Sequence, residues 1–415
     1  MKNPGRHPWH GGNRVQLLEN GEAYYPRVLE AIEAAKDEIF VETFILFDDP
    51  IGKPFQQALI AAARRGCRVE LTVDGYGSAD LTPEFIEEMT SVGIQFHVYR
   101  PQPKVFGVRT NLFRRLHRKL VVIDGRIAFV GGINIAFDHV ADAGPHSKQD
   151  YAVEVEGPVV REIHRFVELS VARHEAKRQQ LRHWWQRRKQ AIPEPEHEPV
   201  GPVEAMFVVR DNERHHDDIE RQYRLAIKSA RSRIVIANAY FFPGWRLLRN
   251  LRDAARRGVD VTLILQGKPD MWYVKWVAEN TYHYLMKAGV RIYEYCERPL
   301  HAKVAVIDDR WATVGSSNLD PLSLYLNLES NLVFRDTAFN AHLASRLRHL
   351  MQQCCREVEW DAIPHRDIRR QLFVFVTYHL GRRFPAWAGW RPAHAPSMGS
   401  TRPEVGDARE APGQA

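Results

Sequence analysis

The sequence contains an internal duplication: the same series of segments occurs twice, at a period much longer than that of any short structural repeat. Residues 31–47 resemble 226–242, residues 63–75 resemble 255–267, residues 91–99 resemble 288–295, and residues 150–155 resemble 329–334. A repeat of this size indicates a duplicated domain rather than a solenoid. Each copy alternates helical segments with apolar strands rich in β-branched residues. The fold class that we expect is α/β, with two similar sandwich halves related by a pseudo-twofold axis and an active site at their interface.

A further pair of repeated segments, 116–125 and 300–309, carries the candidate chemistry. Both copies have a histidine, a lysine two residues later and an aspartate five residues after that, and then a Gly-Gly or Gly-Ser pair followed by an asparagine. The matched residues are His117, Lys119, Asp124, Gly132 and Asn134 in the first copy and His301, Lys303, Asp308, Ser316 and Asn318 in the second. One such motif is a weak signal, but two copies with the same offsets are a strong one.

These residue types suit transfer of a phosphodiester. Two lysines and two asparagines that converge on one phosphate would supply charge and hydrogen bonds to its oxygens, so we expect no metal and no cofactor. Two histidines on opposite sides of phosphorus satisfy in-line displacement, one as nucleophile and the other as general acid and base. Each histidine needs an acceptor on its second nitrogen, and Asp150 and Glu329 follow the motifs at comparable places. Asp124 and Asp308 complete the two motifs and count among the candidate catalytic residues, but they stand just after a strand, where bracing of the loop is a more plausible role than direct contact with substrate.

The doubled motif resembles the phospholipase D superfamily and, within it, the bacterial cardiolipin synthases, most of all their B type. The finer resemblance rests on residues 16–22, 40–44, 112–119, 149–158, 210–213, 237–244 and 314–331. It implies a covalent phosphatidyl-histidine intermediate, with His117 as nucleophile and His301 as acid and base. It also implies crossed pairs, in which Glu329 of the second half orients His117 and Asp150 of the first half orients His301.

The activity implied is that of a phosphatidyl transferase that makes cardiolipin and a free alcohol. Phosphatidylglycerol would serve as donor, acceptor or both, and phosphatidylethanolamine is a further candidate donor. The alternatives are a phospholipase D-type hydrolase, a phosphodiesterase or nuclease, and a lipid-binding protein without catalysis. The halves depart from each other at Gly132 against Ser316 and at Asp150 against Glu329. Ser316 is a candidate phosphate ligand alongside Asn134 and Asn318.

Composition favours an anionic partner, because Lys and Arg exceed Asp and Glu by 58 to 51. We expect an anionic membrane surface and no nucleic acid, since no aromatic-rich module for single strands is evident. Four cysteines without a CxxC spacing indicate a reducing compartment and no zinc site. No signal peptide and no apolar run long enough to cross a bilayer is found, so peripheral attachment on the cytoplasmic side of a bacterial membrane is expected.

The chain divides by composition into five parts. We expect a first half over 1–172, a basic helix and Pro-rich linker over 173–203, a second half over 204–360, an amphipathic membrane-interfacial segment over 361–395 and a disordered tail over 396–415. The interfacial segment has a competing interpretation as a buried last helix, because Gly381 could end such a helix.

Overall fold

The computed structural model describes residues 7–100, 104–105, 108–109, 114–178, 198–267, 281–360 and 398–401 of the 415. Most of the expected linker, residues 179–197, and the whole of the expected interfacial segment, residues 361–395, lie outside these ranges. Within the described ranges, no helix combines the length and the apolar character that crossing a bilayer requires.

Each half is built on a seven-stranded mixed sheet. The first half has β1 (His10–Glu19), β2 (Glu38–Thr43), β3 (Arg68–Asp74), β4 (Gln95–Tyr99), β7 (Leu120–Ile123), β8 (Ile127–Gly131) and β9 (Tyr151–Glu156). The second has β10 (Val203–Arg210), β11 (Arg233–Asn238), β12 (Asp260–Gln266), β13 (Arg291–Tyr295), β14 (Lys303–Ile307), β15 (Trp311–Gly315) and β16 (Glu329–Arg335). The order is β1-β9-β8-β7-β2-β3-β4 in one and β10-β16-β15-β14-β11-β12-β13 in the other, so the two topologies match strand for strand.

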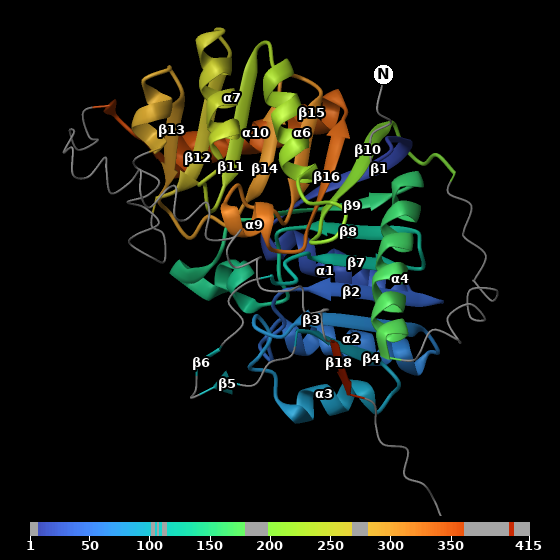
Figure 1. Ribbon diagram of the computed structural model, residues 1–415. Coiled ribbons are helices and arrows are strands. Elements are labelled where there is room, and N and C mark those ends of the chain that lie inside the picture. Colours follow the sequence, from blue (N-terminus) through green and yellow to red (C-terminus); the bar gives the residue numbers. More distant parts are fainter. Residues whose placement is uncertain are drawn as a thin grey trace, which may run out of the picture.

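The two sheets join edge to edge through β1 and β10, which pair antiparallel. With β17 (Cys355–Glu357) on β13 and β18 (Met398–Thr401) on β4, they form one continuous sheet of 16 strands. An antiparallel junction between equivalent strands places a pseudo-twofold axis at that junction, and Figure 1 shows the halves on either side of it. The expected α/β class with two similar halves is therefore confirmed. A separate two-stranded ribbon is formed by β5 (Lys104–Val105) and β6 (Val108–Arg109).

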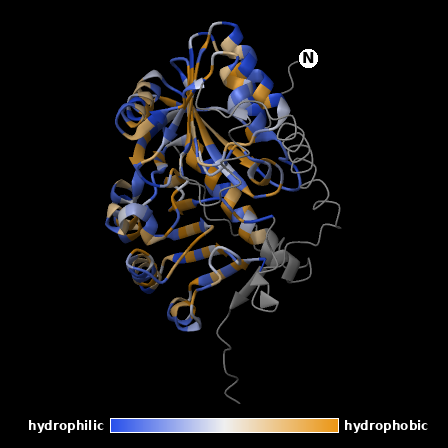
Figure 2. Cartoon of the chain, turned by 90° about the vertical axis from the view of Figure 1, so that its left-hand side faces the viewer, coloured by the Kyte–Doolittle hydropathy of each residue, from blue (hydrophilic) through white to orange (hydrophobic). Residues whose placement is uncertain are grey.

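Helices cover both faces of this sheet. They are α1 (Asn20–Ala34), α2 (Gly52–Arg64), α3 (Pro83–Thr90) and α4 (Pro158–Arg178) in the first half and α6 (Asp218–Ser229), α7 (Trp245–Arg256), α9 (Pro321–Tyr325) and α10 (Thr337–Cys354) in the second, with 3-10 turns at Phe137–His139 and Ala141–His146. One apolar core under α4 and α10 includes strands of both halves, and each half has a second core of its own. Figure 2 shows the strands as the most hydrophobic part of the interior. The shared core fixes the halves relative to each other.

Two of the expected boundaries fall at elements that the structure describes. The first half was expected to end at residue 172, but α4 continues without a break to Arg178. Its buried apolar positions, all before residue 172, pack on strands of both halves, and the helix runs on into the segment that was expected to begin as a basic helix. In the tail expected to be disordered, residues 398–401 form β18 along the edge of β4.

Candidate active site between the two halves

The two motif histidines are held in place by the opposite half of the molecule. The backbone N–H of His117 donates to the carbonyl of Leu328 at 2.9 Å, and that of His301 donates to the carbonyl of Gln149 at 2.8 Å. The residue next to each of these carbonyls in the chain is a motif carboxylate, Glu329 or Asp150. The backbone therefore brings each histidine beside the carboxylate of the other half.

The side chains complete this crossed arrangement. His117 Nδ1 lies 3.0 Å from Glu329 Oε2, and His301 Nδ1 lies 2.5 Å from Asp150 Oδ2. Both carboxylates have no solvent-exposed surface. A neutral imidazole that donates from Nδ1 keeps the lone pair of Nε2 free, which is the tautomer that a nucleophile or general base requires. The pairs are the ones that the family resemblance implied.

Gly132 and Ser316 occupy equivalent places beside these two carboxylates. A Cβ atom at Gly132 would lie only 2.4 Å and 2.5 Å from the carboxylate oxygens of Asp150. Ser316 has room for its side chain, and its hydroxyl donates to Glu329 Oε2 at 2.5 Å. The two differences between the halves are therefore linked. The shorter carboxylate, Asp150, packs against Gly132, and the longer one, Glu329, accepts a hydrogen bond from Ser316. Ser316, for which we expected a contact with phosphate, donates here to the carboxylate partner of His117.

Alanine at these two positions should have unequal effects. In Gly132→Ala the added methyl group must displace Asp150 from His301, so we expect turnover to fall about 100-fold, the cost typical of a displacement of roughly 1 Å at a catalytic group. In Ser316→Ala one hydrogen bond to Glu329 is lost, and we expect a loss of about tenfold or less. Rates on phosphatidylglycerol measure both variants, and equal losses would contradict this account of the two positions.

The motif lysines are buried and reach back to their own motifs. Lys119 Nζ donates to the carbonyl of His117 at 2.6 Å, and Lys303 Nζ donates to that of His301. Burial lowers the pKa of Lys119 to about 7 and that of Lys303 to about 8, although Asp150 and Glu329 oppose the shift. An ammonium group has three donors, so each lysine retains donors beyond its carbonyl contact.

The two motif asparagines differ in their contacts. The Oδ1 atom of Asn134 accepts the N–H of Ile45 at 3.3 Å, which leaves its amide N–H donors for the pocket that it lines. The Oδ1 atom of Asn318 is buried and has no hydrogen-bond partner among the described residues. A buried unpaired amide oxygen is costly unless a further partner satisfies it.

Asp124 and Asp308 lie outside the pocket and brace the loops after the motif strands, as expected. Asp124 accepts the N–H groups of residues 36–38, and Asp308 accepts those of residues 231–233. Both have a φ of +51°, a left-handed conformation that asparagine and aspartate tolerate best after glycine. Burial alone would raise the pKa of Asp308, but the N–H donors outweigh it and hold the pKa below its ordinary value.

Removing this brace should reduce stability without touching the chemistry. We expect Asp308→Ala to lower the free energy of unfolding by about 1–2 kcal/mol, and Asp308→Asn by less, because asparagine keeps an acceptor and the left-handed conformation. The folded-state pKa is depressed, so the charged form stabilises the fold above the unfolded pKa, and this contribution disappears as the pH falls through the folded pKa. The difference between wild type and Asp308→Asn should therefore shrink in acid. Denaturant titrations measure it, with Asp309→Asn at the exposed neighbouring position as control.

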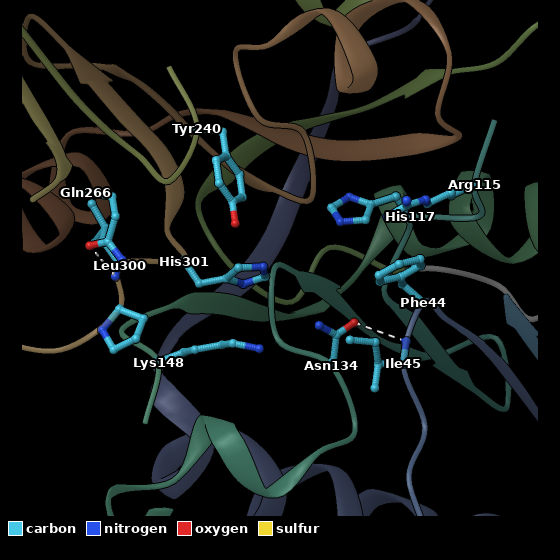
Figure 3. Close-up of a pocket in the computed structure, with 11 residues that line it drawn as sticks. Phe44, Ile45, Arg115, His117, Asn134, Lys148, Tyr240, Gln266, Leu300 and His301 are labelled. Atoms are coloured by element: carbon cyan, nitrogen blue, oxygen red, sulfur yellow. Dashed lines mark hydrogen bonds between the residues drawn. The ribbon is translucent and has the colours of Figure 1, made fainter. Parts of the chain in front are cut away.

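A pocket of about 230 Å³ lies between the halves and contains both histidines. Figure 3 shows the two imidazoles on this common pocket, with Phe44 and Arg115 on the side of His117 and with Tyr240, Gln266 and Lys148 on the side of His301. None of these five residues was identified from the sequence, because they stand outside the repeated motif.

His139 is a third histidine that sequence reasoning missed. It is fully buried, its ring packs edge-on against that of His301 with 5.5 Å between centroids, and its Nε2 atom accepts the N–H of Asn134. Its ligand atoms lie within 4.8 Å of those of Asp150 and His301, a spacing that also fits a cation. Lysines around these three residues oppose a positive ion there, because they already lower the pKa of His301.

The lowered pKa values of both motif imidazoles favour their neutral forms. Burial lowers the pKa of His117 to about 4, although Glu329 opposes it. Burial, Lys303 and Lys148 hold the pKa of His301 well below its ordinary value. For Glu329, burial alone would raise the pKa, but His117 and Lys119 outweigh it and keep it lowered. An anion between the histidines would raise both imidazole pKa values, because it favours their charged forms.

Comparison with known proteins agrees with this geometry. The crystal structure of phosphatidylserine synthase from Haemophilus influenzae Rd KW20 has a similar fold, with a TM-score of 0.68 and 12% identity over 92% of this chain and 97% of that one. The chain is a phospholipase D-like protein, because a family profile of PLD-like domains matches both of its halves. The profile of the family described as "Cardiolipin synthase, PLD-like domain" matches residues 28–165 and 223–351, and the chain belongs to this family. It is 52% identical to cardiolipin synthase B of Salmonella typhi over 95% of this chain and 94% of that protein. To cardiolipin synthase B of Escherichia coli K12 it is 49% identical, again over 95% and 94%.

Proposed function

We propose that this protein is a cardiolipin synthase, a phosphatidyl transferase that moves a phosphatidyl group from one phospholipid to a hydroxyl of phosphatidylglycerol. The donor is phosphatidylglycerol or phosphatidylethanolamine, and the products are cardiolipin and a free alcohol. The observation that carries the proposal is the pair of imidazoles, one from each half and each anchored through Nδ1, on one pocket. Membership of the cardiolipin synthase family supports the lipid substrate.

The first half-reaction forms a covalent intermediate. Nε2 of His117 attacks phosphorus, and the bond between phosphorus and the headgroup oxygen breaks. His301, which takes up a proton when the anionic substrate binds, gives that proton to the departing alkoxide. Glu329 holds the Nδ1–H of His117, so Nε2 presents its lone pair to phosphorus, and it stabilises the positive ring that forms.

The second half-reaction reverses the roles. His301, now neutral, takes the proton of the acceptor hydroxyl, the new oxygen–phosphorus bond forms, and the bond between phosphorus and His117 breaks. The buried ammonium groups of Lys119 and Lys303 and the amide of Asn134 stabilise charge on the phosphate oxygens in both steps. Alcohol must compete with water at about 55 M, which requires an oriented acceptor and a site that limits water.

Binding of a phosphodiester should be accompanied by proton uptake. The pKa values of His301, Lys119 and Lys303 are lowered, and a bound anion would raise them, so affinity should increase as the pH falls from 9 to 7. We expect roughly one proton per diethyl phosphate bound at pH 8. Calorimetry in buffers of different ionisation enthalpy measures this, and His301→Gln should reduce the uptake while Lys53→Met, on the surface, leaves it unchanged. Binding without any uptake would contradict the electrostatics proposed for the site.

The enzyme acts at an anionic membrane surface, on its cytoplasmic side, as a peripheral protein. The net positive charge supports attraction to anionic lipid, and all four cysteines are free, as suits a reducing compartment. We propose no role for nucleic acid, a cofactor or a metal ion.

Lipid product analysis tests the function. Purified protein is incubated with phosphatidylglycerol in detergent micelles, and mass spectrometry follows cardiolipin, phosphatidic acid and glycerol. Cardiolipin as main product, at a rate that a metal chelator does not change, supports the proposal. Phosphatidic acid without cardiolipin would identify a hydrolase instead, and strong inhibition by the chelator would reveal a metal in the reaction.

A further inference from the structure

The two sides of the pocket are chemically different, although the fold is pseudo-symmetric. The repeat pairs Gln266 with Asp74, and both accept the N–H of the residue before a motif histidine: Leu300 at 3.0 Å and Leu116 at 2.7 Å. The same bracing contact is thus made by a neutral amide on the His301 side and by a carboxyl group on the His117 side. The bracing group on the His301 side therefore carries no negative charge of its own.

Lys148 is the second difference between the sides. It stands two residues before Asp150, as Asn327 stands two residues before Glu329. Asn327 is buried and tied into the backbone: its carbonyl accepts from Arg210, and its Oδ1 accepts the N–H of Arg115. At the equivalent position, the first half places a cation on the wall of the pocket.

The ammonium group of Lys148 has one ion-pair partner and retains N–H donors for another. It forms an ion pair with Asp138, and its side chain is 22% exposed. Its backbone N–H donates to the carbonyl of Asp138 at 2.7 Å, so the loop fixes where the side chain starts. Figure 3 shows Lys148 extending beneath the ring of His301, with the hydroxyl of Tyr240 pointing toward that ring from the other side. One carboxylate contact leaves N–H donors of the ammonium for a second anion.

The geometry of in-line displacement determines which substrate binds on the His301 side of the pocket. With His117 as nucleophile, the leaving headgroup departs on the side of His301, and the acceptor hydroxyl enters from there. An acceptor phospholipid carries its own phosphate diester next to the attacking glycerol hydroxyl, whereas glycerol, ethanol and water carry none. A cation on this side distinguishes these two kinds of acceptor.

We propose that Lys148 forms an anion subsite that binds the phosphate of the acceptor phospholipid and so selects an anionic lipid over a neutral alcohol in the second half-reaction. The proposal rests on the proposed function. In the step that it assists, His301 takes the hydroxyl proton, the glycerol oxygen bonds to phosphorus and the His117–phosphorus bond breaks. Lys148 itself exchanges no proton and touches only the second, unreactive phosphate.

Matched acceptors test the subsite. The full chain is given phosphatidylglycerol as donor and either glycerophosphoglycerol or ethanol as added acceptor, and mass spectrometry measures each transfer product together with cardiolipin. In Lys148→Met we expect cardiolipin formation and transfer to glycerophosphoglycerol to fall about 10- to 100-fold, the loss typical of one charge-assisted hydrogen bond. Transfer to ethanol should fall far less, because ethanol offers the cation nothing to bind, and any effect of the lost charge on His301 is common to both acceptors.

Two further variants separate charge from structure. Lys148→Arg keeps a cation and should retain most of the preference for the anionic acceptor, while Lys53→Met removes a surface charge of the same kind and should change neither product. Equal losses with both acceptors, or unchanged cardiolipin formation in Lys148→Met, would overturn the subsite. A wild-type enzyme that makes neither cardiolipin nor either transfer product would overturn the proposed function itself, an outcome visible before any variant is made.

Discussion

His117→Ala should abolish turnover of phosphatidylglycerol, with a loss of at least about 10⁴-fold, because no other group can form the bond to phosphorus. His301→Ala should lose about 10²–10⁴-fold on the same substrate, since the alkoxide leaving group then departs without a proton. Both variants should keep the fold, because each imidazole lies on the pocket wall and not in an apolar core. Two inactive variants alone would not say which histidine is the nucleophile.

A phospholipid with p-nitrophenolate as leaving group separates the two roles. This leaving group needs no general acid, so His301→Ala should still release about one nitrophenolate per enzyme and then stall, because the second step lacks its base. His117→Ala should show no such burst. The reverse result would make His301 the nucleophile and would move the acceptor to the other side of the pocket. His216→Ala, an exposed histidine, serves as control, and wild-type rates from both pocket variants would refute the proposed mechanism.

Much of this site could be predicted because the duplication is visible in the sequence. Equal offsets in two copies identified both motifs, and the position of Asp124 and Asp308 just after a strand already indicated their bracing role. The crossed pairing of Asp150 and Glu329 came only from the family resemblance. Local sequence contains no sign of it, since the pairing depends on strands β1 and β10 joining the halves edge to edge.

The remaining pocket residues could not be predicted for a physical reason. Tyr240 and Lys148 reach the pocket from two separate loops and Gln266 from the end of β12, and only the assembled halves bring these segments together. The second copy has no histidine at the position equivalent to His139, so the duplication does not identify this residue as part of the site. One signal was present: where the aligned halves differ in charge, as at Lys148 against Asn327, the chain distinguishes the two sides of its own active site.

The orienting carboxylates should respond differently to removal of their charge. The two oxygens of Asp150 accept different hydrogen bonds: Oδ1 accepts the N–H of Tyr151 at 2.8 Å, and Oδ2 accepts from His301. Asn at this position has one oxygen for two donors. If the amide oxygen still accepts from Tyr151, the NH₂ group faces His301 and imposes the wrong tautomer on that ring. If the amide oxygen instead faces His301, the NH₂ group and the N–H of Tyr151 face each other without an acceptor. We expect a loss of about 10³–10⁴-fold in Asp150→Asn, comparable to the loss of an orienting carboxylate in other histidine-dependent enzymes.

Both hydrogen bonds that Glu329 accepts from side chains are at one oxygen. Its Oε2 accepts both from His117 and from Ser316, while Oε1 is buried without a partner among the described residues. A glutamine carbonyl can take the place of Oε2 and keep both contacts, so the tautomer of His117 survives and only the negative charge is lost. We expect Glu329→Gln to retain more activity than Asp150→Asn, with a loss of about 10–100-fold that reflects weaker stabilisation of the charged ring. Steady-state rates on phosphatidylglycerol, with thermal unfolding to check the fold, measure both. Equal losses would mean that charge alone, and not the direction of each hydrogen bond, explains why the two histidines need carboxylates.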